Sequence, residues 1–170
     1  MPSSMNENKP YALDIITRVI KPRHILDVGC GMGTYYDLLK PHLPDVAIDG
    51  VEIWEPYISQ YKLDEKYDYL YFDDARQIGF MPYDLVIFGD VLEHMTNEDA
   101  LSVWDIARRS AGWGMISLPI VHYPQGAEFG NPYEEHVQDH INVDDLERDF
   151  GPFDYKETFR MTGTFFKRFE

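Results

Sequence analysis

Carboxylate side chains recur in this sequence just after segments rich in β-forming residues. Asp27 lies in the first such segment, HILDV, and Glu52 lies near the end of the second, AIDGVEI. Asp74 follows the third segment and Asp90 follows the fourth. In an open α/β sheet, ligands bind beyond the carboxyl ends of the strands, so these carboxylates are expected to meet at one edge. Such a site suits a ligand with positive charge or with hydroxyl groups to donate.

A glycine-rich stretch, LDVGCGMGT, follows the first segment. Its spacing is G-x-G-x-G at Gly29, Gly31 and Gly33, whereas a dinucleotide site has G-x-G-x-x-G, and Thr34 stands where that third glycine would be. Asp27 places a negative charge where a pyrophosphate would be repelled and an ammonium group would be attracted. Glycines allow the backbone to approach such a ligand closely.

Two further carboxylates define the rest of this ligand. Glu52 lies just over twenty residues beyond Gly29, which suits a bidentate grip on two ribose hydroxyls. Asp74 is placed to accept a hydrogen bond from an exocyclic amine such as that of adenine. An ammonium group, a ribose and an adenine together describe S-adenosylmethionine.

The secondary-structure pattern alternates between strands and helices. Helices are predicted over 7–20, 34–43, 55–62, 97–110 and 142–150, and strands over 24–28, 47–53, 69–72, 83–88 and 113–120, with a closing antiparallel pair over 154–160 and 162–169. This alternation predicts a doubly wound α/β fold with a mostly parallel sheet and helices on both faces. We expect a single domain over 1–170, with an N-terminal helical segment over 1–22 and a candidate lid loop over 119–142.

Four motifs in order resemble the class I S-adenosylmethionine-dependent methyltransferases: LDVGCGMGT, DGVEIWEPYI, FDDARQI and YDLVIFGDVLEHM, across residues 24–95. The resemblance implies a seven-stranded sheet of order 3-2-1-4-5-7-6 with strand 7 antiparallel. It also implies site residues: Asp27, Gly29, Gly31 and Gly33 at the methionine moiety, Glu52 at the ribose, Asp74 at the adenine, and Gly89 and Asp90 near the sulfonium. The family more often has Asp at the ribose position, and Glu52 retains the carboxylate.

Methyl transfer from a sulfonium needs little beyond in-line positioning of the acceptor. A base helps only where the acceptor is a hydroxyl or a protonated amine. Asp90, His94, His122, His136 and His140 are the candidates. His122 directly follows the fifth strand, so we predict His122, with Asp90 and His94, as the catalytic residues.

A metal site is an alternative interpretation of the fourth motif. Asp90, Glu93 and His94 lie at i, i+3 and i+4, one face of a helical turn, and His136 or His140 could complete the ligands. The string is similar to the Glu-x-x-Glu-His of metal-using O-methyltransferases, which include small-RNA 2′-hydroxyl and ubiquinone-pathway enzymes. Metal-free relatives also carry D-V-L-E-H, so we expect no metal, with Glu93, His94 and His136 as the alternative ligand set.

Composition restricts the partners. Thirty acidic and fifteen basic residues give a formal net charge of −15, which disfavours a nucleic-acid substrate and leaves a small-molecule acceptor. No apolar segment is long enough to span a membrane. The single cysteine, Cys30, fits a reducing compartment, so a cytoplasmic location is expected. A dehydrogenase, a non-catalytic S-adenosylmethionine-binding protein and a homo-oligomer that completes the acceptor site remain alternatives.

Overall fold

The computed structural model describes residues 5–79 and 82–170. Its strands are β1 (His24–Val28), β2 (Ala47–Glu52), β3 (Leu70–Phe72), β4 (Tyr83–Gly89), β5 (Ala111–Pro119), β6 (Tyr155–Thr158) and β7 (Thr162–Arg168). Its helices are α1 (Lys9–Asp14), α2 (Thr34–Leu39), α3 (Glu55–Tyr61), α4 (Leu63–Lys66), α5 (Asn97–Ser110) and α6 (Val143–Asp149). Three further helical segments are the π-helical η1 (Ile15–Ile20) and the 3-10 turns η2 (Leu92–His94) and η3 (Pro132–Glu134).

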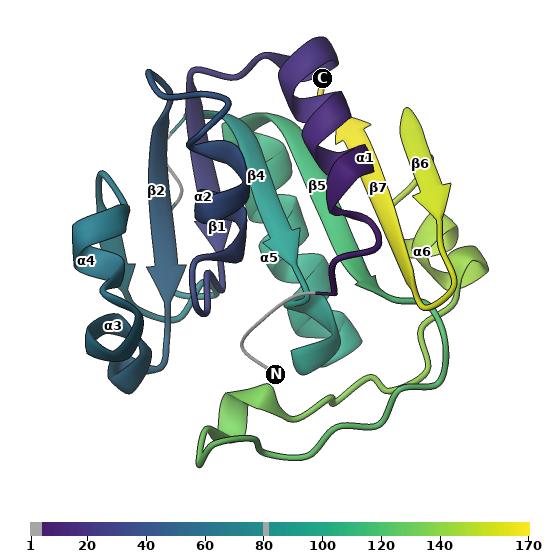
Figure 1. The fold of residues 1–170 in the computed structure, drawn as a ribbon. Coiled ribbons are helices and arrows are strands. Elements are labelled where there is room, and N and C mark those ends of the chain that lie inside the picture. The colour runs from purple at the N-terminus through teal and green to yellow at the C-terminus, as the bar shows by residue number, and fades with distance from the viewer. Residues whose placement is uncertain (1–4, 80–81) are drawn as a thin grey trace.

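The strands form one sheet of order β3-β2-β1-β4-β5-β7-β6, as expected. The β1–β2, β1–β4, β2–β3 and β4–β5 pairs are parallel, whereas β7 runs antiparallel to both β5 and β6. Figure 1 shows α1 and α2 on one face of the sheet and α5 on the other. The carboxyl ends of β1, β2 and β4 lie together at one edge, and the long segment between β5 and α6 passes across this edge.

Successive strand residues face opposite sides of the sheet and therefore contribute to two cores. Leu26 and Val28 pack with α5 and α6 on one side, whereas Ile25 packs with α1, η1 and α2 on the other. Trp104 of α5 lies at the centre of an aromatic group, with ring centres 5.9 Å from Phe88, 5.9 Å from Phe150 and 5.1 Å from Phe169. Both faces of the sheet are thus covered by packed side chains. The edges at which the strands end remain available for a functional site.

Most of the predicted elements are present with shifted ends. The predicted helix over 7–20 is α1 followed by the π-helical η1, and residues 1–4 of the predicted N-terminal segment lie outside the described residues. The predicted helix over 34–43 stops as a regular helix at Leu39 and continues in turns to Leu43. The sequence did not indicate α4. Thr96 and Asn142 cap α5 and α6, and their side chains accept hydrogen bonds from the N–H groups of Asp99 and Asp145.

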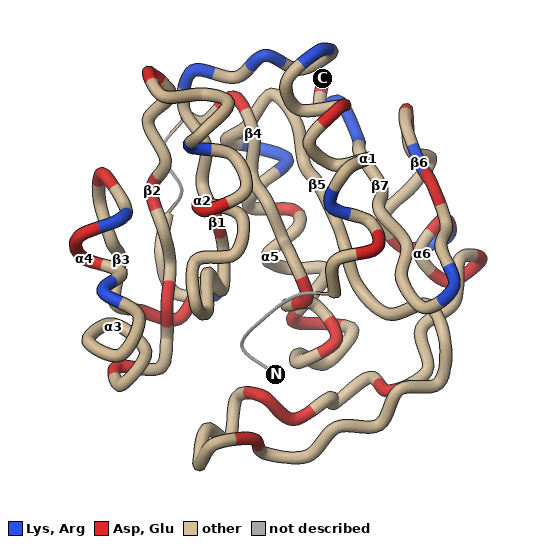
Figure 2. Tube along the Cα trace, viewed as in Figure 1, with Lys and Arg blue, Asp and Glu red and all other residues tan. Residues whose placement is uncertain are grey.

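Charge is distributed unevenly between the two ends of the strands. Figure 2 shows acidic residues at the carboxyl ends of β2 and β4, at the start of α5 and in the segment after β5. Lys and Arg residues are more frequent at the opposite edge of the sheet. Among the described residues, no helix has the length and apolar character needed to cross a bilayer.

Candidate active site

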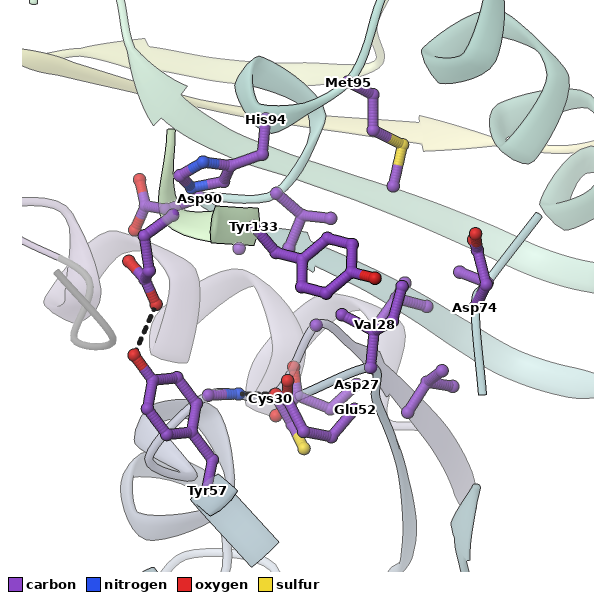
Figure 3. A pocket seen from close by; sticks show the side chains of 18 of the residues that line it. Asp27, Val28, Cys30, Glu52, Tyr57, Asp74, Asp90, His94, Met95 and Tyr133 are labelled. Atoms are coloured by element: carbon purple, nitrogen blue, oxygen red, sulfur yellow. Dashed lines mark hydrogen bonds between the residues drawn. The ribbon is translucent and has the colours of Figure 1, made fainter. Parts of the chain in front are cut away.

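A cavity of about 260 Å³ opens at the carboxyl ends of the strands (Figure 3). The predicted site residues that line it are Asp27, Gly29, Gly31, Glu52, Asp74, Gly89, Asp90 and His94. Among the described residues, its lining contains seven carboxylate side chains and a single Arg or Lys, Arg76. Residues that are up to 110 positions apart in the chain, from Asp27 to Val137, therefore meet at this edge, where the ends of β1, β2 and β4 and the turn after β3 converge. The resulting electrostatic environment favours a ligand that carries positive charge.

Glu52 organises the glycine loop. Its Oε2 accepts a hydrogen bond from the Gly31 N–H at 2.8 Å, and its Oε1 accepts one from the Trp54 N–H at 2.8 Å. The side chain is buried, and this burial raises the pKa of Glu52 to about 7 despite these two donors. Each carboxylate oxygen retains a second lone pair that a ligand hydroxyl can use.

Asp27 lies beneath the same loop and is also buried. Its Oδ2 accepts a hydrogen bond of 2.6 Å from the Tyr67 hydroxyl, a partner that gave no signal in the sequence. Burial raises the pKa of Asp27 to about 7, against the opposing effects of the Tyr67 hydrogen bond and the Lys9 charge. A cationic ligand beside Asp27 would stabilise its ionised form and offset this cost of burial.

The backbone of the loop requires glycine at Gly29. Its φ is +64°, in the left-handed region, and a Cβ there would lie 2.6 Å from Cγ2 of Val91. Gly31 and Gly33 also have positive φ values of 55° and 84°. Gly33 forms the N-terminal boundary of α2 and, unlike the other two glycines, does not line the cavity. The glycines thus shape a tight turn between β1 and α2, as the spacing indicates.

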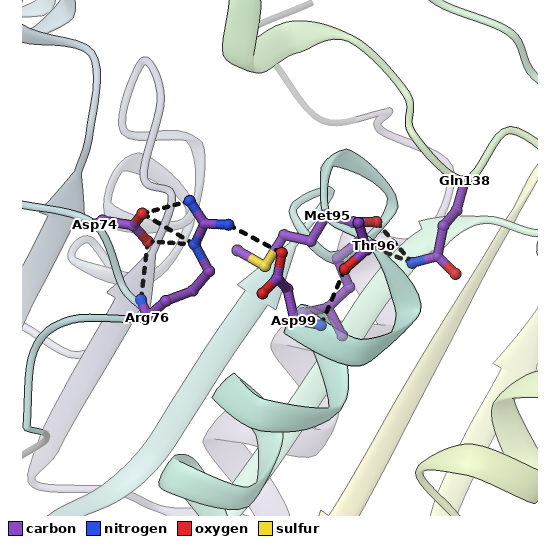
Figure 4. A network of polar contacts seen from close by, with 7 residues as sticks. Asp74, Arg76, Met95, Thr96, Asp99 and Gln138 are labelled. Atoms are coloured by element: carbon purple, nitrogen blue, oxygen red, sulfur yellow. Dashed lines mark hydrogen bonds and ion pairs between the residues drawn. The ribbon is translucent and has the colours of Figure 1, made fainter.

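Asp74 is held by its neighbour Arg76 at the far end of the cavity (Figure 4). Oδ1 accepts hydrogen bonds from the Arg76 backbone N–H and from Nε, both at 2.9 Å, and Oδ2 accepts from Nη2 at 2.6 Å. The hydrogen bonds from Arg76 lower the pKa of Asp74, so this carboxylate remains ionised. Sequence reasoning singled out Asp74 but did not anticipate that Arg76 would be its partner.

Asp90 directly follows β4 and has a left-handed conformation, with φ of +56°. Its N–H donates to the Ser117 carbonyl at 2.7 Å, which holds it at the junction between β4 and β5. A non-glycine residue in this region costs of order 1 kcal/mol, and such residues occur frequently at functional sites. The preceding Gly89 lies against the Tyr35 ring. A Cβ at Gly89 would lie 2.0 Å from that ring, so the close contact requires glycine.

Glu93, His94 and His136 offer ligand atoms that all lie within 4.8 Å of one another. His94 Nδ1 lies 3.1 Å from the Glu135 carbonyl, and His136 Nδ1 lies 2.6 Å from the Tyr123 carbonyl. Each carbonyl fixes a tautomer with the proton on Nδ1 and leaves the Nε2 lone pair available. Burial lowers the pKa of His94 to about 4, so its imidazole is neutral at physiological pH.

The structure does not bring His122 to this cavity. Its side chain is 59% exposed and lies 4.0 Å from Asp139, beside His140. The reason is that β5 ends at Pro119 and the next residues run out along the long connecting segment. Of the predicted catalytic residues, only Asp90 and His94 line the cavity. His136 lies beside His94 but does not line the cavity itself.

The segment between β5 and α6 forms the outer wall. Asn131, Tyr133, Glu134 and Val137 line the cavity, whereas Phe129 is 74% exposed. The segment is joined to α3 by a 3.0 Å hydrogen bond from the Tyr57 hydroxyl to Glu134 and to Trp54 by a ring contact from Tyr133. Figure 3 shows this Tyr57 bond at one end of the cavity. No pattern in the sequence singled out Glu134 as a residue that lines the cavity.

The first helix contributes to the floor of the site. Lys9 of α1 is buried, and its Nζ donates a 2.8 Å hydrogen bond to the hydroxyl of Tyr35, which lines the cavity. Its neighbour Asn8 donates to Ser117 Oγ at 2.6 Å and to Thr164 Oγ1 at 3.1 Å. Nothing in the local sequence distinguishes Lys9 from a solvated helix residue, so only the tertiary structure reveals this role.

Comparison with known proteins agrees with this geometry. A family model described as a methyltransferase domain matches residues 26–112, which is just over half of the chain. No protein with a curated description matches the sequence.

Many solved structures share the fold. An S-adenosylmethionine-dependent methyltransferase from Clostridium acetobutylicum is 14% identical with a TM-score of 0.72, over 97% of this chain and 92% of that one. The magnesium protoporphyrin IX methyltransferase of Synechocystis, with S-adenosylhomocysteine bound, is 15% identical with a TM-score of 0.70, over 96% and 83%.

Human N-acetylserotonin methyltransferase, in complex with S-adenosylmethionine, is 13% identical with a TM-score of 0.70, over 96% of this chain. This chain spans between 52% and 57% of the length of that enzyme and of several other matched structures. The matched family model, the strand order and the site at the strand ends thus agree. The chain belongs to the class I S-adenosylmethionine-dependent methyltransferases, a family of enzymes whose cofactor is S-adenosylmethionine.

Proposed function

We propose that this protein transfers the methyl group of S-adenosylmethionine to a small-molecule acceptor by in-line displacement. The observation that carries the proposal is the pair of buried carboxylates, Asp27 and Glu52, at the glycine loop of the acidic cavity. Burial raises the pKa of both side chains to about 7. A ligand with an ammonium group and ribose hydroxyls would supply positive charge and further hydrogen-bond donors to these carboxylates.

Each part of the cofactor has a candidate partner in the cavity. Asp27 and the loop of Gly29, Gly31 and Gly33 would hold the methionine moiety, Glu52 the ribose and Asp74 the adenine amine, with Gly89 and Asp90 beside the sulfonium. When bound, S-adenosylmethionine supplies an electrophilic methyl group that a lone pair of the acceptor displaces, leaving S-adenosylhomocysteine. The residues of this chain need only orient the two molecules and exclude water, which can contribute about 7–11 kcal/mol.

His94 and Asp90 are the proposed proton acceptors. His94 lines the cavity as a neutral imidazole, and its Nε2 is free to accept because Nδ1 faces the Glu135 carbonyl. Asp90 lies one residue beyond β4 at the same wall. A base at this position would take the proton of a hydroxyl or an ammonium acceptor.

The acidic lining supports a neutral or cationic acceptor of small size. The cavity must accommodate both the cofactor and the reacting part of the acceptor. A polyanion such as RNA would approach an edge that is rich in carboxylates and poor in Lys and Arg (Figure 2). We further propose that the segment over 119–142 acts as a lid, that residues 1–170 form one domain, and that the free thiol of Cys30 reflects a reducing, cytoplasmic location.

Calorimetry with S-adenosylhomocysteine tests the proposal. We expect the wild type to bind, and Glu52→Gln to bind at least about tenfold more weakly because a charged hydrogen-bond acceptor is lost. Glu55→Gln changes an exposed residue of α3 in the same way and should have no effect. Equal affinity in all three proteins contradicts the assigned site. Binding without methyl transfer to any acceptor in a broad screen would favour a non-catalytic cofactor-binding protein.

A second candidate function is metal-assisted O-methylation, because Glu93, His94 and His136 lie together. Both Glu93 oxygens are buried without a hydrogen-bond partner among the described residues, which is costly unless a cation or a proton neutralises the carboxylate. These three residues are the alternative ligand set expected from the sequence, whereas Asp90, the first carboxylate of the motif, is not part of the cluster. These oxygen and nitrogen ligands suit Mn²⁺ or Zn²⁺, which would polarise a hydroxyl acceptor. Titration of Mn²⁺ and Zn²⁺ into the wild type and His136→Ala tests this candidate, and equal metal binding by the two proteins excludes it.

A further inference from the structure

Arg76 forms a bridge between the turn after β3 and the first turn of α5. Its Nε and Nη2 bind Asp74, and its Nη1 donates to Asp99 Oδ2 at 2.9 Å (Figure 4). All three residues line the cavity that is proposed to hold the cofactor. The three side chains are between 20% and 39% exposed, so these ion pairs are partly solvated. Partly exposed pairs of this kind contribute little to folding stability, which leaves positioning as their main effect.

The bridge limits what Asp74 can bind. A carboxylate has about four lone-pair positions, and Arg76 directs three donors at this one, namely its backbone N–H, Nε and Nη2. The Nε donor is shared between the two oxygens, at 2.9 Å from each. At most one acceptor position therefore remains for a ligand. Because Arg is always protonated and its fork is rigid, the carboxylate is held ionised in one orientation. An ionised carboxylate accepts a hydrogen bond from an amino group and repels a carbonyl oxygen in the same place.

The other end of the bridge is also fixed. Asp99 lies in the first turn of α5, where its N–H donates to the capping Thr96 Oγ1 at 3.2 Å. The preceding residue, Met95, accepts a 2.9 Å hydrogen bond on its carbonyl from Gln138 of the segment between β5 and α6. Figure 4 shows this series of contacts from Asp74 through Arg76 and Asp99 to Gln138. The position of Asp74 is thus set by elements on both sides of the cavity.

We propose that Arg76 is a positioning residue that makes the site specific for a 6-aminopurine, by holding Asp74 as a single-site acceptor for the exocyclic amine. The inference rests on the proposed function, since it requires the adenine to bind at Asp74. A purely structural role for Arg76 would affect all ligands equally. A positioning role affects the preference between purines that differ at C6.

The test compares S-adenosyl-L-homocysteine with S-inosyl-L-homocysteine, in which a carbonyl oxygen replaces the amino group. Calorimetry gives a dissociation constant for each ligand and each protein. We expect the wild type to prefer the adenosyl ligand by about 10- to 100-fold, as for a hydrogen bond to a charged group. In Arg76→Gln this preference should fall to within about threefold. Asp99→Asn leaves the Asp74 pair intact and removes only the second anchor, so it should lose part of the preference.

Arg108→Gln is the matched control. Arg108 is on the exposed side of α5 and pairs with Asp105, so its removal should leave the preference unchanged. Circular dichroism checks that each variant is folded, and Asp99→Asn carries the test if Arg76→Gln does not fold. Binding of S-adenosylhomocysteine with no preference in the wild type, or with the full preference in the Arg76 or Asp99 variant, overturns the inference and leaves the proposed function standing. A wild type that binds neither ligand overturns the proposed function itself.

Discussion

The Lys9 ammonium lies 2.8 Å from the Tyr35 hydroxyl and 4.1 Å from the centre of the Tyr35 ring. Tyr35 lines the cavity, so the first helix supports the site from below. The charges of Asp90, Asp27 and Glu93 act on Lys9, whereas burial lowers the pKa of Lys9 to about 8. The buried ammonium is therefore a local counter-charge for these carboxylates.

Replacement of Lys9 by Met should destabilise the protein by about 3 kcal/mol, because it leaves buried carboxylates without their cation. Urea denaturation at neutral pH measures the free energy of unfolding. Arg18→Met is the control, since Arg18 belongs to the same N-terminal helical segment and pairs with Asp14 at the surface. It should change the stability by no more than about 0.5 kcal/mol. A similar loss in both variants would contradict the role of Lys9.

Stability should fall as the pH rises from about 4 to about 7, because of Asp27 and Glu52. Burial raises the pKa of both groups from ordinary values near 4 to about 7, so in this window the folded state binds more protons than the unfolded state. The resulting stabilisation is present below pH 4 and is lost as the pH passes 7. Urea denaturation of the wild type and of Asp27→Asn across this range isolates the effect.

The Asp27→Asn curve should be flatter than that of the wild type. The exposed substitution Asp64→Asn should run parallel to the wild type. Cofactor affinity should show the opposite trend to stability, rising from pH 6 to pH 8 as the two carboxylates ionise. An affinity that is constant over this range would count against a cationic ligand at Asp27.

Gly29→Ala should destabilise the protein by about 2 kcal/mol and weaken cofactor binding. The new Cβ would occupy a left-handed conformation and contact Val91 at 2.6 Å. Gly126→Ala is the matched control, because Gly126 does not have a left-handed φ and a Cβ there meets nothing within 4 Å. Thermal unfolding and calorimetry of the two variants provide the comparison, and equal behaviour would argue against a tight turn at Gly29.

Tyr57→Phe should increase the dissociation rate of S-adenosylhomocysteine about three- to tenfold. The change removes the hydroxyl that binds Glu134 and joins the segment between β5 and α6 to α3. Stopped-flow fluorescence of the tryptophans provides the rate. Tyr61→Phe is the control and changes the same helix. The Tyr61 hydroxyl accepts a hydrogen bond from the neighbouring Gln60, so its loss should leave the rate unchanged. Equal rates in the two variants would mean that this contact does not retain the ligand.

Much of the fold follows from local patterns in the sequence. The strand HILDV has the predicted limits, and the Thr96 and Asn142 caps begin the two helices that follow them. A strand such as β4 can be predicted because it contains a continuous apolar run, LVIF. Helix caps can be predicted because certain side-chain oxygens satisfy the free N–H groups of a first turn. Elements whose ends are determined by tertiary contacts are harder to predict. One example is α4, which is only four residues long.

Residues of the cavity that lie at the ends of strands could be predicted from the sequence. Asp27, Glu52 and Asp90 belong to this class, and all three line the cavity. His122 failed this expectation because a loop residue is positioned by its own contacts rather than by the preceding strand. The role of Arg76 could not be predicted from the sequence, because it depends on a contact with Asp99, which is 23 positions away on another element.

Helix α5 passes into β5 without an intervening residue, whereas more than twenty residues separate β5 from α6. Four of those residues form the outer wall of the cavity, and the strand ends form the inner wall. Under the proposed function, exchanging that stretch of chain for another sequence would rebuild one wall of the pocket and leave the parallel strands unchanged. Redesign of the acceptor range would then start from this one connection.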